Sequence, residues 1–251
     1  MNVEVSSVSK KSEPISEAAA AIYVLTAEDI RKSGAMSIPD ALRMVPGVQV
    51  AQIDANKWAV TARGFNGSFA NKLLVLVDGR SVYTPLYSGV YWNVQDVLLE
   101  DIDRIEVIRG PGATLWGANA VNGVINILTK SAAETKGVFV SGGSGSYDRA
   151  NGEIRYGRSL KGNGAFRAYG KWFEKDGFDD ASGKSTLDAW KMLRGGLRAD
   201  WELGSNSNLT LQGDAYDGEA NTVYHLPSIS FPYSQTLHSV APLRGRILWR
   251  A

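Results

Sequence analysis

The sequence contains no cysteine and only two histidines. Without cysteine the chain has no disulfide framework and no cysteine-based metal or nucleophilic site. The histidines, His225 and His238, fall in one segment that is predicted to be a long loop, with no carboxylate or cysteine cluster beside them, so we expect surface residues rather than metal ligands. No Ser-His-Asp spacing or pair of carboxylates stands out. We therefore expect no catalytic residues, no metal and no cofactor.

Charge and hydrophobic length set two further limits. The 27 basic and 26 acidic side chains leave a net charge of +1, which creates no field for gathering nucleic acid. The longest apolar runs, Ala18–Leu25 and Leu73–Val77, are far shorter than the roughly 20 residues of a membrane-spanning helix. The Gly-rich segment 109–117 lacks the Gly-Lys-Ser/Thr ending of a phosphate loop, so a nucleotide site is not expected either.

Residues 21–130 have the pattern of an α+β domain. A capping box at Thr26 and Asp29 predicts one short helix that ends at Gly34, and Ser37 begins a second. Further helical turns are expected near Val94–Leu99 and at Ala113–Trp116. Short apolar or alternating runs predict strands at Ile22–Leu25, Val48–Ile53, Trp58–Arg63, Leu73–Val77, Arg104–Arg109 and Val121–Thr129.

From Gly137 onward the helical periodicity gives way to alternation. In Leu193–Leu203 the odd positions are largely apolar and the even positions are mostly charged. The alternation predicts about six strands, at Gly137–Gly143, Arg149–Ser159, Ala165–Glu174, Leu193–Leu203, Leu209–Ala215 and Leu243–Trp249. A soluble antiparallel sheet with one wet face produces the same alternation.

The connections between these strands alternate in length. Leu160–Gly164 and Gly204–Ser207 are tight turns, whereas Lys175–Asp188 and Gly218–Pro242 are predicted to be long loops. Short turns on one side, long loops on the other, and aromatic residues near strand ends are typical of an outer-membrane β-barrel. Together with the many charged residues at the polar positions of the alternation, they favour the membrane barrel over the soluble sheet.

Several motifs follow one another in a defined order. Arg-Gly-Phe stands at 63–65 and Leu-Val-Asp-Gly-Arg at 76–80, and the later motifs are Glu-Val-Ile-Arg-Gly-Pro at 106–111, Leu-Trp-Gly-Ala-Asn-Ala at 115–120 and Gly-Val-Ile-Asn-Ile at 123–127. In these motifs the chain resembles the TonB-dependent outer-membrane receptors.

The resemblance implies an α+β plug domain followed by antiparallel transmembrane β-barrel strands. The expected divisions are an extended tail at 1–14, the plug at 15–132 and the start of the barrel at 133–251. Such receptors close with about 22 strands, and the chain stops in mid-strand at Arg250-Ala251, so we expect an incomplete barrel from the N-terminal part of a longer receptor. No signal-peptide pattern is visible at the N-terminus.

The resemblance also implies a function in the outer membrane, in contact with lipid. The implied function is the energy-coupled uptake of a scarce ligand, most commonly a ferric siderophore or another metal chelate. The implied partner is a TonB-type energy-transducing protein. Two alternatives stay open. One is a plug-like binding or signalling module that does not itself transport, and the other is an enzyme such as a periplasmic hydrolase.

Three sets of residues carry the implied roles. The partner would bind a TonB box by strand addition, against the alternative of a frayed terminus, at Val3, Glu4, Val5, Ser6, Ser7 and Val8. Arg63 and Arg109 would latch the plug to barrel glutamates, with Glu106 bracing them, unless they are ordinary surface arginines. Loops 52–57, 66–71 and 81–92 would contact ligand, unless their aromatics pack the plug against the barrel; the candidates are Trp58, Phe65, Asn66, Tyr83, Tyr87, Tyr91 and Trp92.

Overall fold

The chain divides into two compact units. The computed structural model describes residues 4–5, 13–14, 21–67, 69–110, 116–117, 119–204, 207–225, 230–240 and 244–249, with the backbone alone beyond residue 222. The first unit comprises the chain up to Ile53 and residues 57–129, and the second unit comprises residues 54–56 together with 130–251. Among the described residues, no helix is long and apolar enough to cross a membrane.

The first unit is built on a five-stranded sheet. In sheet order its strands are β3 (Ile22–Thr26), β8 (Ile102–Arg109), β9 (Gly123–Thr129), β6 (Leu73–Val77) and β7 (Arg80–Ser81). β6 and β9 run parallel, and the other neighbours run antiparallel. The hairpin of β4 (Val48–Asp54) and β5 (Lys57–Ala62) forms a separate two-stranded sheet. The predicted strands are therefore present in this unit.

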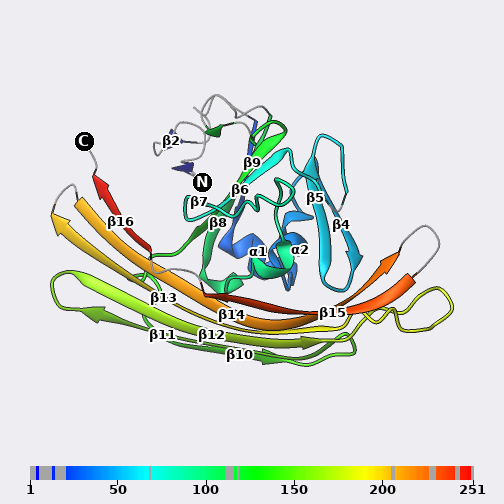
Figure 1. Cartoon of the computed structure of the whole chain (residues 1–251). Coiled ribbons are helices and arrows are strands. Elements are labelled where there is room, and N and C mark those ends of the chain that lie inside the picture. The colour runs from blue at the N-terminus through cyan, green and yellow to red at the C-terminus, as the bar shows by residue number, and fades with distance from the viewer. Residues whose placement is uncertain are drawn as a thin grey trace. The chain divides into compact units, whose positions relative to one another are not determined.

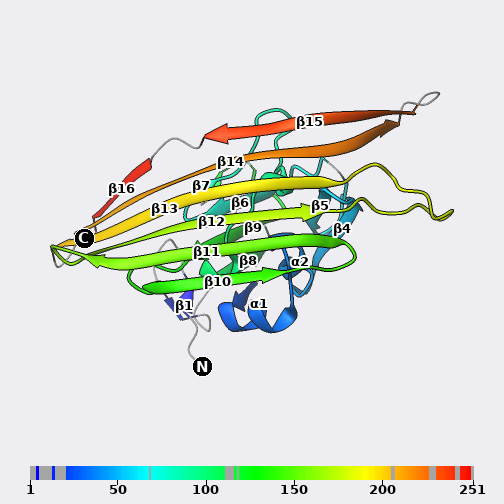
Figure 2. The ribbon, with the colours of Figure 1, turned by 90° about the horizontal axis from the view of Figure 1, so that it is seen from below.

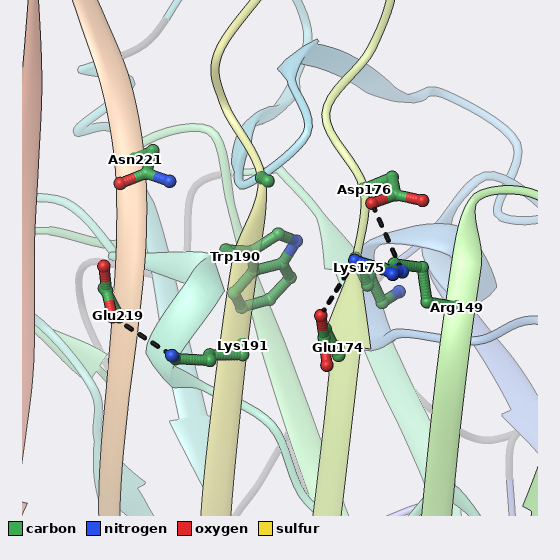
Figure 3. Close-up of a pocket in the computed structure, with 9 residues that line it drawn as sticks. Arg149, Glu174, Lys175, Asp176, Trp190, Lys191, Glu219 and Asn221 are labelled. Atoms are coloured by element: carbon green, nitrogen blue, oxygen red, sulfur yellow. Dashed lines mark hydrogen bonds and ion pairs between the residues drawn. The ribbon is translucent and has the colours of Figure 1, made fainter.

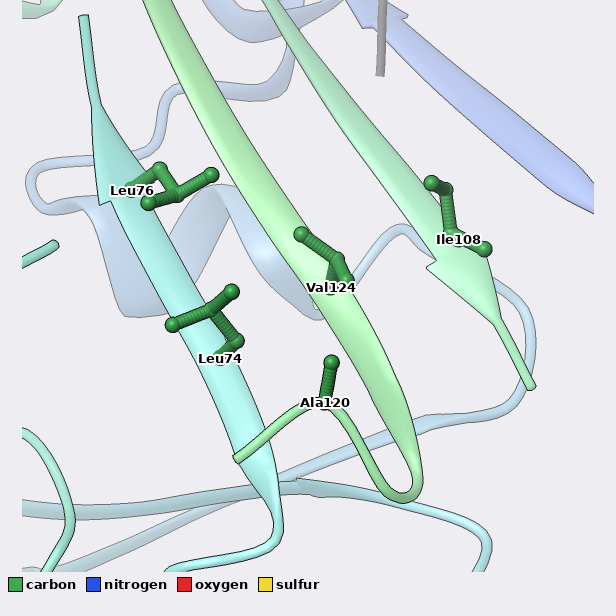
Figure 4. Close-up of a cluster of buried hydrophobic side chains, with 5 residues drawn as sticks. All are labelled: Leu74, Leu76, Ile108, Ala120 and Val124. Carbon is green, nitrogen blue, oxygen red and sulfur yellow. The ribbon is translucent and has the colours of Figure 1, made fainter. Parts of the chain in front are cut away.

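One face of the five-stranded sheet carries a compact apolar cluster. Leu74 lies opposite Val124 on the neighbouring strand, and Val124 in turn lies opposite Ile108. Figure 4 shows these side chains together with Leu76 and with Ala120 from the segment before β9. Leu73–Val77 is buried at every position, as expected for a strand covered on both faces.

The helices of the first unit begin at side-chain caps. α1 (Ala27–Ser33) has the predicted capping box, with the Asp29 backbone N–H 3.2 Å from Thr26 Oγ1 and the Thr26 N–H 3.0 Å from Asp29 Oδ2. Gly34 ends it in the left-handed conformation, and α1 contacts β3 and β8. Ser37 caps α2 (Ile38–Leu42) in the same way.

The helix expected at Val94–Leu99 is wrong. Two short 3-10 helices cover only the ends of this segment, η1 (Trp92–Val94) and η2 (Leu99–Asp101). Between them Gln95 and Leu98 leave the helical region, and a β-branched Val97 is a poor residue on which to continue a turn. Most of the turn expected at Ala113–Trp116 lies outside the described residues.

The second unit is an antiparallel sheet whose strands curve together (Figure 1). Its strands, seen face-on in Figure 2, are β10 (Gly137–Gly143), β11 (Asp148–Leu160), β12 (Gly164–Lys175), β13 (Trp190–Gly204), β14 (Ser207–His225), β15 (Ser230–Val240) and β16 (Arg244–Trp249). β15 and β16 pair with successive parts of the same edge of β14. The described sheet is therefore six strands wide and does not close on itself, in agreement with the incomplete barrel that the sequence predicts.

The loop predicted at Gly218–Pro242 is wrong. β14 continues to His225, and its residues 215–225 pair with residues 230–240 of β15. Polar residues occupy both faces there and Pro232 interrupts the pattern, so alternation gives no signal, whereas backbone pairing with β13 and β15 does not depend on it. The two histidines consequently lie on strands, with His238 opposite Asp217 and His225 opposite Ser230.

Candidate functional site

Aromatic side chains gather on loops of the first unit. The Tyr87 ring packs edge-on against Phe69 and against Tyr91, with ring centroids 5.1 Å apart in both pairs. We call these three residues the aromatic cluster. Phe69 is 68% exposed, and the neighbouring Phe65 and Leu86 are 87% and 80% exposed. So much exposed apolar surface on adjoining loops is characteristic of a binding surface.

The loop that carries the cluster is held by its own backbone. Thr84 and Gly89 form an isolated antiparallel bridge, with the Thr84 N–H donating to the Gly89 carbonyl at 2.8 Å. The Ser88 N–H donates to the Thr84 carbonyl at 3.0 Å. A Cβ on Gly89 would lie 2.2 Å from the Tyr87 ring and 2.6 Å from the Ala70 carbonyl oxygen. Only glycine allows this close approach of the loop to the ring.

The Tyr87 hydroxyl stays protonated at neutral pH. Burial, and secondarily the nearby Tyr91, raise the pKa of Tyr87 to about 12. Tyr83 shares a hydrogen bond of 3.1 Å with the Ser88 hydroxyl. The surface therefore offers aromatic faces and hydroxyl groups, which suit a bulky organic ligand or chelate.

The expected ligand residues separate into two groups. Phe65, Asn66, Tyr83 and Tyr91 are exposed and Tyr87 is half-buried. The two tryptophans, Trp58 and Trp92, are each only 7% exposed. The sequence also gave no reason to single out Phe69 and Leu86, although both lie within the loops that were proposed for ligand contact.

The structure brings Arg63 and Arg109 together. Arg63 Nη2 donates to the backbone oxygen of Arg109 at 3.0 Å, and Arg109 Nη1 donates to the Pro46 oxygen at 3.0 Å. A Cβ on Gly47 or on Gly110 would lie 3.4 Å from the Arg109 Cδ or 3.5 Å from Arg63 Nη2, respectively, and both glycines have positive φ. Within the described part of the chain, neither guanidinium forms an ion pair with a carboxylate.

Glu106 lies apart from this arginine pair. Its side chain is fully buried in the middle of β8, where Arg104 Nε donates to Glu106 Oε1 at 2.8 Å. Arg104 also pairs with Asp103. Glu106 and Arg109 are three positions apart on the same strand, and this odd spacing places them on opposite faces. Glu106 therefore neutralises Arg104 inside the first unit.

The two faces of the second unit's sheet differ in chemistry. One face carries cross-strand or neighbouring ion pairs, such as Lys171–Glu153 at 3.2 Å, together with Lys175–Asp148, Arg194–Asp214 and Arg198–Asp200. The opposite face exposes apolar side chains, among them Val138, Val140, Ile154, Tyr156, Trp172, Leu193, Leu197 and Leu211. Strand register aligns these apolar residues, since Val140 faces Ile154 and Trp172 faces Leu193. Such a sheet can meet hydrocarbon on one side and water on the other.

A cavity of about 170 Å³ opens at one end of strands β11 to β14 (Figure 3). Its charged lining residues pair with one another, as in Arg149–Glu174 and Lys191–Glu219, both at 3.2 Å. Because the opposite charges compensate, the cavity presents no net charge that would select an ionic ligand.

Only part of the predicted partner-binding tail is described. Glu4 and Val5 form β1, which pairs antiparallel with β2 (Glu13–Pro14). The remaining positions, Val3, Ser6, Ser7 and Val8, lie outside the described residues. The described pair has the extended backbone that strand addition uses.

Comparison with known proteins bears on both units. The profile of the TonB-dependent Receptor Plug Domain family matches residues 14–124. The vitamin B12 transporter BtuB of Vibrio vulnificus is 34% identical over 169 residues, which are 66% of this chain and 27% of that protein. BtuB of Photobacterium profundum is 32% identical over an alignment of 254 residues that covers 95% of this chain and 39% of that protein.

The chain belongs to the TonB-dependent receptor family. The ferripyoverdine receptor of the outer membrane of Pseudomonas aeruginosa has the same fold, with a TM-score of 0.67 at 22% identity over 87% of this chain and 28% of that one. The first unit is thus the plug of a TonB-dependent receptor, and the second contributes barrel strands. The chain spans about a quarter to two-fifths of the length of these relatives.

Proposed function

We propose that this receptor takes up a bulky metal chelate across the outer membrane, and that a TonB-type protein supplies the energy. One observation carries the proposal: a receptor plug is joined to strands that present an apolar face on one side and paired charges on the other. A sheet of that kind is suited to enclose a polar passage within lipid. A plug is needed only where such a passage must stay closed between transport events.

The proposed ligand is a metal chelate with a large organic frame, either a ferric siderophore or a corrinoid. The aromatic cluster supports this class, because a group of edge-on rings offers a wide apolar area to flat or macrocyclic ligands. The named relatives are consistent with it, since one transports vitamin B12, a cobalt chelate, and another receives ferripyoverdine.

The two remaining sets of residues take the roles that the family implies. The segment Val3–Val8 would add a strand to the energy-transducing partner, with main-chain hydrogen bonds providing affinity. Arg63 and Arg109 would hold the plug through carboxylates of the barrel wall. The role is supported by two neighbouring arginines whose hydrogen bonds, in the described part of the chain, go to backbone carbonyls and not to carboxylates.

A substitution in the tail of the full-length receptor tests the proposal. Val5→Pro removes a backbone N–H that strand pairing needs, whereas Val5→Ile keeps the backbone and serves as the matched control. We expect Val5→Pro, like deletion of Val3–Val8, to leave chelate binding by whole cells unchanged and to abolish uptake. Full uptake by the deletion variant would refute energy coupling through the tail, and binding without uptake in the native receptor would favour the non-transporting binding module.

A further inference from the structure

The carboxylate of Asp188 joins two segments of the second unit. Its Oδ2 accepts the backbone N–H of Ala55 at 2.7 Å. Its Oδ1 accepts the Phe178 N–H at 2.9 Å and the Thr186 hydroxyl at 2.6 Å. Ala55 lies in the turn between β4 and β5, whereas Phe178 and Thr186 lie in the loop between β12 and β13. One side chain therefore bonds simultaneously to two segments that are more than 120 residues apart in sequence.

Two further side chains hold the turn in place, Asn56 from the turn itself and Tyr147 from outside it. Asn56 Nδ2 donates to the Asp188 carbonyl at 3.0 Å and to the Asn221 carbonyl on β14 at 2.7 Å. The Tyr147 hydroxyl donates to the Ala55 carbonyl at 3.1 Å, and the Tyr147 ring stacks on Phe178 at 4.9 Å. The turn and the loop thus share Asp188 and Tyr147 as common contacts.

Among the described residues, the buried Asp188 carboxylate is bonded only by uncharged groups. It is 2% exposed, and all its partners in the described part of the chain are uncharged donors. Hydrogen bonds to a charged acceptor are stronger than neutral ones, and a buried donor that loses its acceptor pays the full cost of desolvation. When either segment moves away, the carboxylate loses the hydrogen bonds which that segment donates. The donors of the other segment must then stabilise the buried charge alone, so the position of one segment affects how firmly the other is held.

The backbone around Asp188 is shaped to fit the carboxylate. A Cβ on Gly177 would lie 2.5 Å from Asp188 Oδ1 and 3.2 Å from the Ala189 backbone nitrogen. The glycine therefore lets the loop approach the carboxylate closely enough for the Phe178 N–H to reach it. A side chain at position 177 would push the loop away from Asp188.

We propose that Asp188 is a positioning residue that couples the order of the loop 176–189 to that of the turn 54–56. Release of the turn loosens the loop, and release of the loop loosens the turn to the same extent, since coupling free energies are reciprocal. In the proposed function, on which this role in ligand capture rests, a ligand touching one segment would thereby fix the other. The coupling itself is measurable without ligand or transport, so its failure is distinct from failure of the proposed function.

Trypsin cleavage after Lys184 reports on the loop, because this lysine is exposed there. The test uses the full-length receptor in isolated outer membranes, with the fragments identified by mass. Asn56→Ala removes the hydrogen bonds from the turn to the Asp188 and Asn221 carbonyls and leaves every side chain of the loop in place. We expect it to raise the cleavage rate at Lys184 by about 10-fold, as expected for the loss of two hydrogen bonds to backbone carbonyls that hold the turn. Asn93→Ala, a partly buried asparagine of the first unit, is the matched control and should leave the rate unchanged.

The reverse direction uses a single thiol. These 251 residues contain no cysteine, and Ala55→Cys is made in a full-length receptor that carries no other thiol; because Ala55 is fully buried, the new thiol should react slowly with a maleimide. Thr186→Val removes one hydroxyl from the loop and is expected to increase that reaction about 10-fold. Asp188→Asn should increase both rates, because an amide offers an acceptor to only one of the two segments.

Folding of each variant is checked by heat-modifiable electrophoretic migration. If Asp188→Asn fails to fold, Asn56→Ala and Thr186→Val still decide the matter. An unchanged Lys184 cleavage rate in folded Asn56→Ala would overturn the coupling, as would an unchanged Ala55→Cys reactivity in folded Thr186→Val.

Discussion

Leu197→Arg distinguishes a lipid-facing sheet from one that faces water. Leu197 lies in the middle of β13, opposite Ala168 on β12 and Gly213 on β14. It is 47% exposed, on the apolar face of the sheet. Leu187, in the loop before β13, is 54% exposed and provides a matched control for the same substitution. The two leucines have similar exposed fractions, but Leu197 lies on the strand and Leu187 lies in a loop.

The expected magnitudes are well separated. In water, substitution of an exposed surface residue usually changes the free energy of unfolding by no more than about 0.5 kcal/mol. At the middle of a bilayer, an arginine on the lipid face of a barrel costs about 2–4 kcal/mol. We therefore expect Leu197→Arg to destabilise the membrane-inserted receptor by about 2–4 kcal/mol and Leu187→Arg by about 0.5 kcal/mol or less.

Denaturant titration of the full-length receptor folded into lipid vesicles measures both values. Tryptophan fluorescence follows the loss of the folded state, and the two variants are compared with the native chain in the same vesicles. Equal small effects of the two substitutions would show that the face of Leu197 meets water. The assignment of this sheet to a membrane barrel would then be wrong.

Three further substitutions test local features of the plug. Thr26→Ala should lower the free energy of unfolding by about 1 kcal/mol at neutral pH through loss of the helix cap. Hydrogen bonds from Thr26 lower the pKa of Asp29 below its ordinary value of 3.8, so the stability that depends on the Asp29 carboxylate is present above pH 3.8 and is lost as the pH falls through the lowered pKa. Denaturant titration at pH 7 and at pH 3 measures this difference. Arg104→Ala removes the cation beside the buried Glu106 and should destabilise the receptor by about 3 kcal/mol, measured by thermal unfolding. Gly89→Ala should weaken chelate binding about 10-fold by displacing the aromatic cluster, measured by equilibrium binding to whole cells.

Matched variants control each of these predictions. Thr26→Ser keeps the hydroxyl and should retain most of the stability, and Arg104→Lys keeps a positive charge near Glu106. Gly67→Ala has no atom within 4 Å of the new methyl group and should bind chelate as the native receptor does. A loss of affinity in Gly67→Ala as large as in Gly89→Ala would argue against the aromatic cluster as the binding surface.

Local signals in the sequence predicted local structure well. The capping box at Thr26 and the turn at Leu160–Gly164 depend on a few adjacent residues, and both are present, the turn with Gly162 and Asn163 at positive φ. The alternation in Leu193–Leu203 likewise identified the exposed apolar face, because strand period and burial are directly linked.

Features set by distant partners were not predictable in this way. β14 extends past Gly218 because β13 and β15 pair with its backbone, which no periodicity of side chains reveals. The burial of Trp58 and Trp92 depends on tertiary packing, which the identity of an aromatic residue alone does not predict. In the sequence nothing distinguishes Asp188 from an ordinary loop carboxylate, because its partner Ala55 is 133 residues away.

Uptake of radiolabelled chelate by cells that produce the full-length receptor tests the central claim most directly. The measurement is made with ferric siderophores and with cobalamin, in cells with and without the TonB-type partner. We predict saturable uptake of at least one chelate that disappears without the partner while surface binding persists. Uptake at the same rate in both strains, or binding that never leads to uptake in either, would contradict the account.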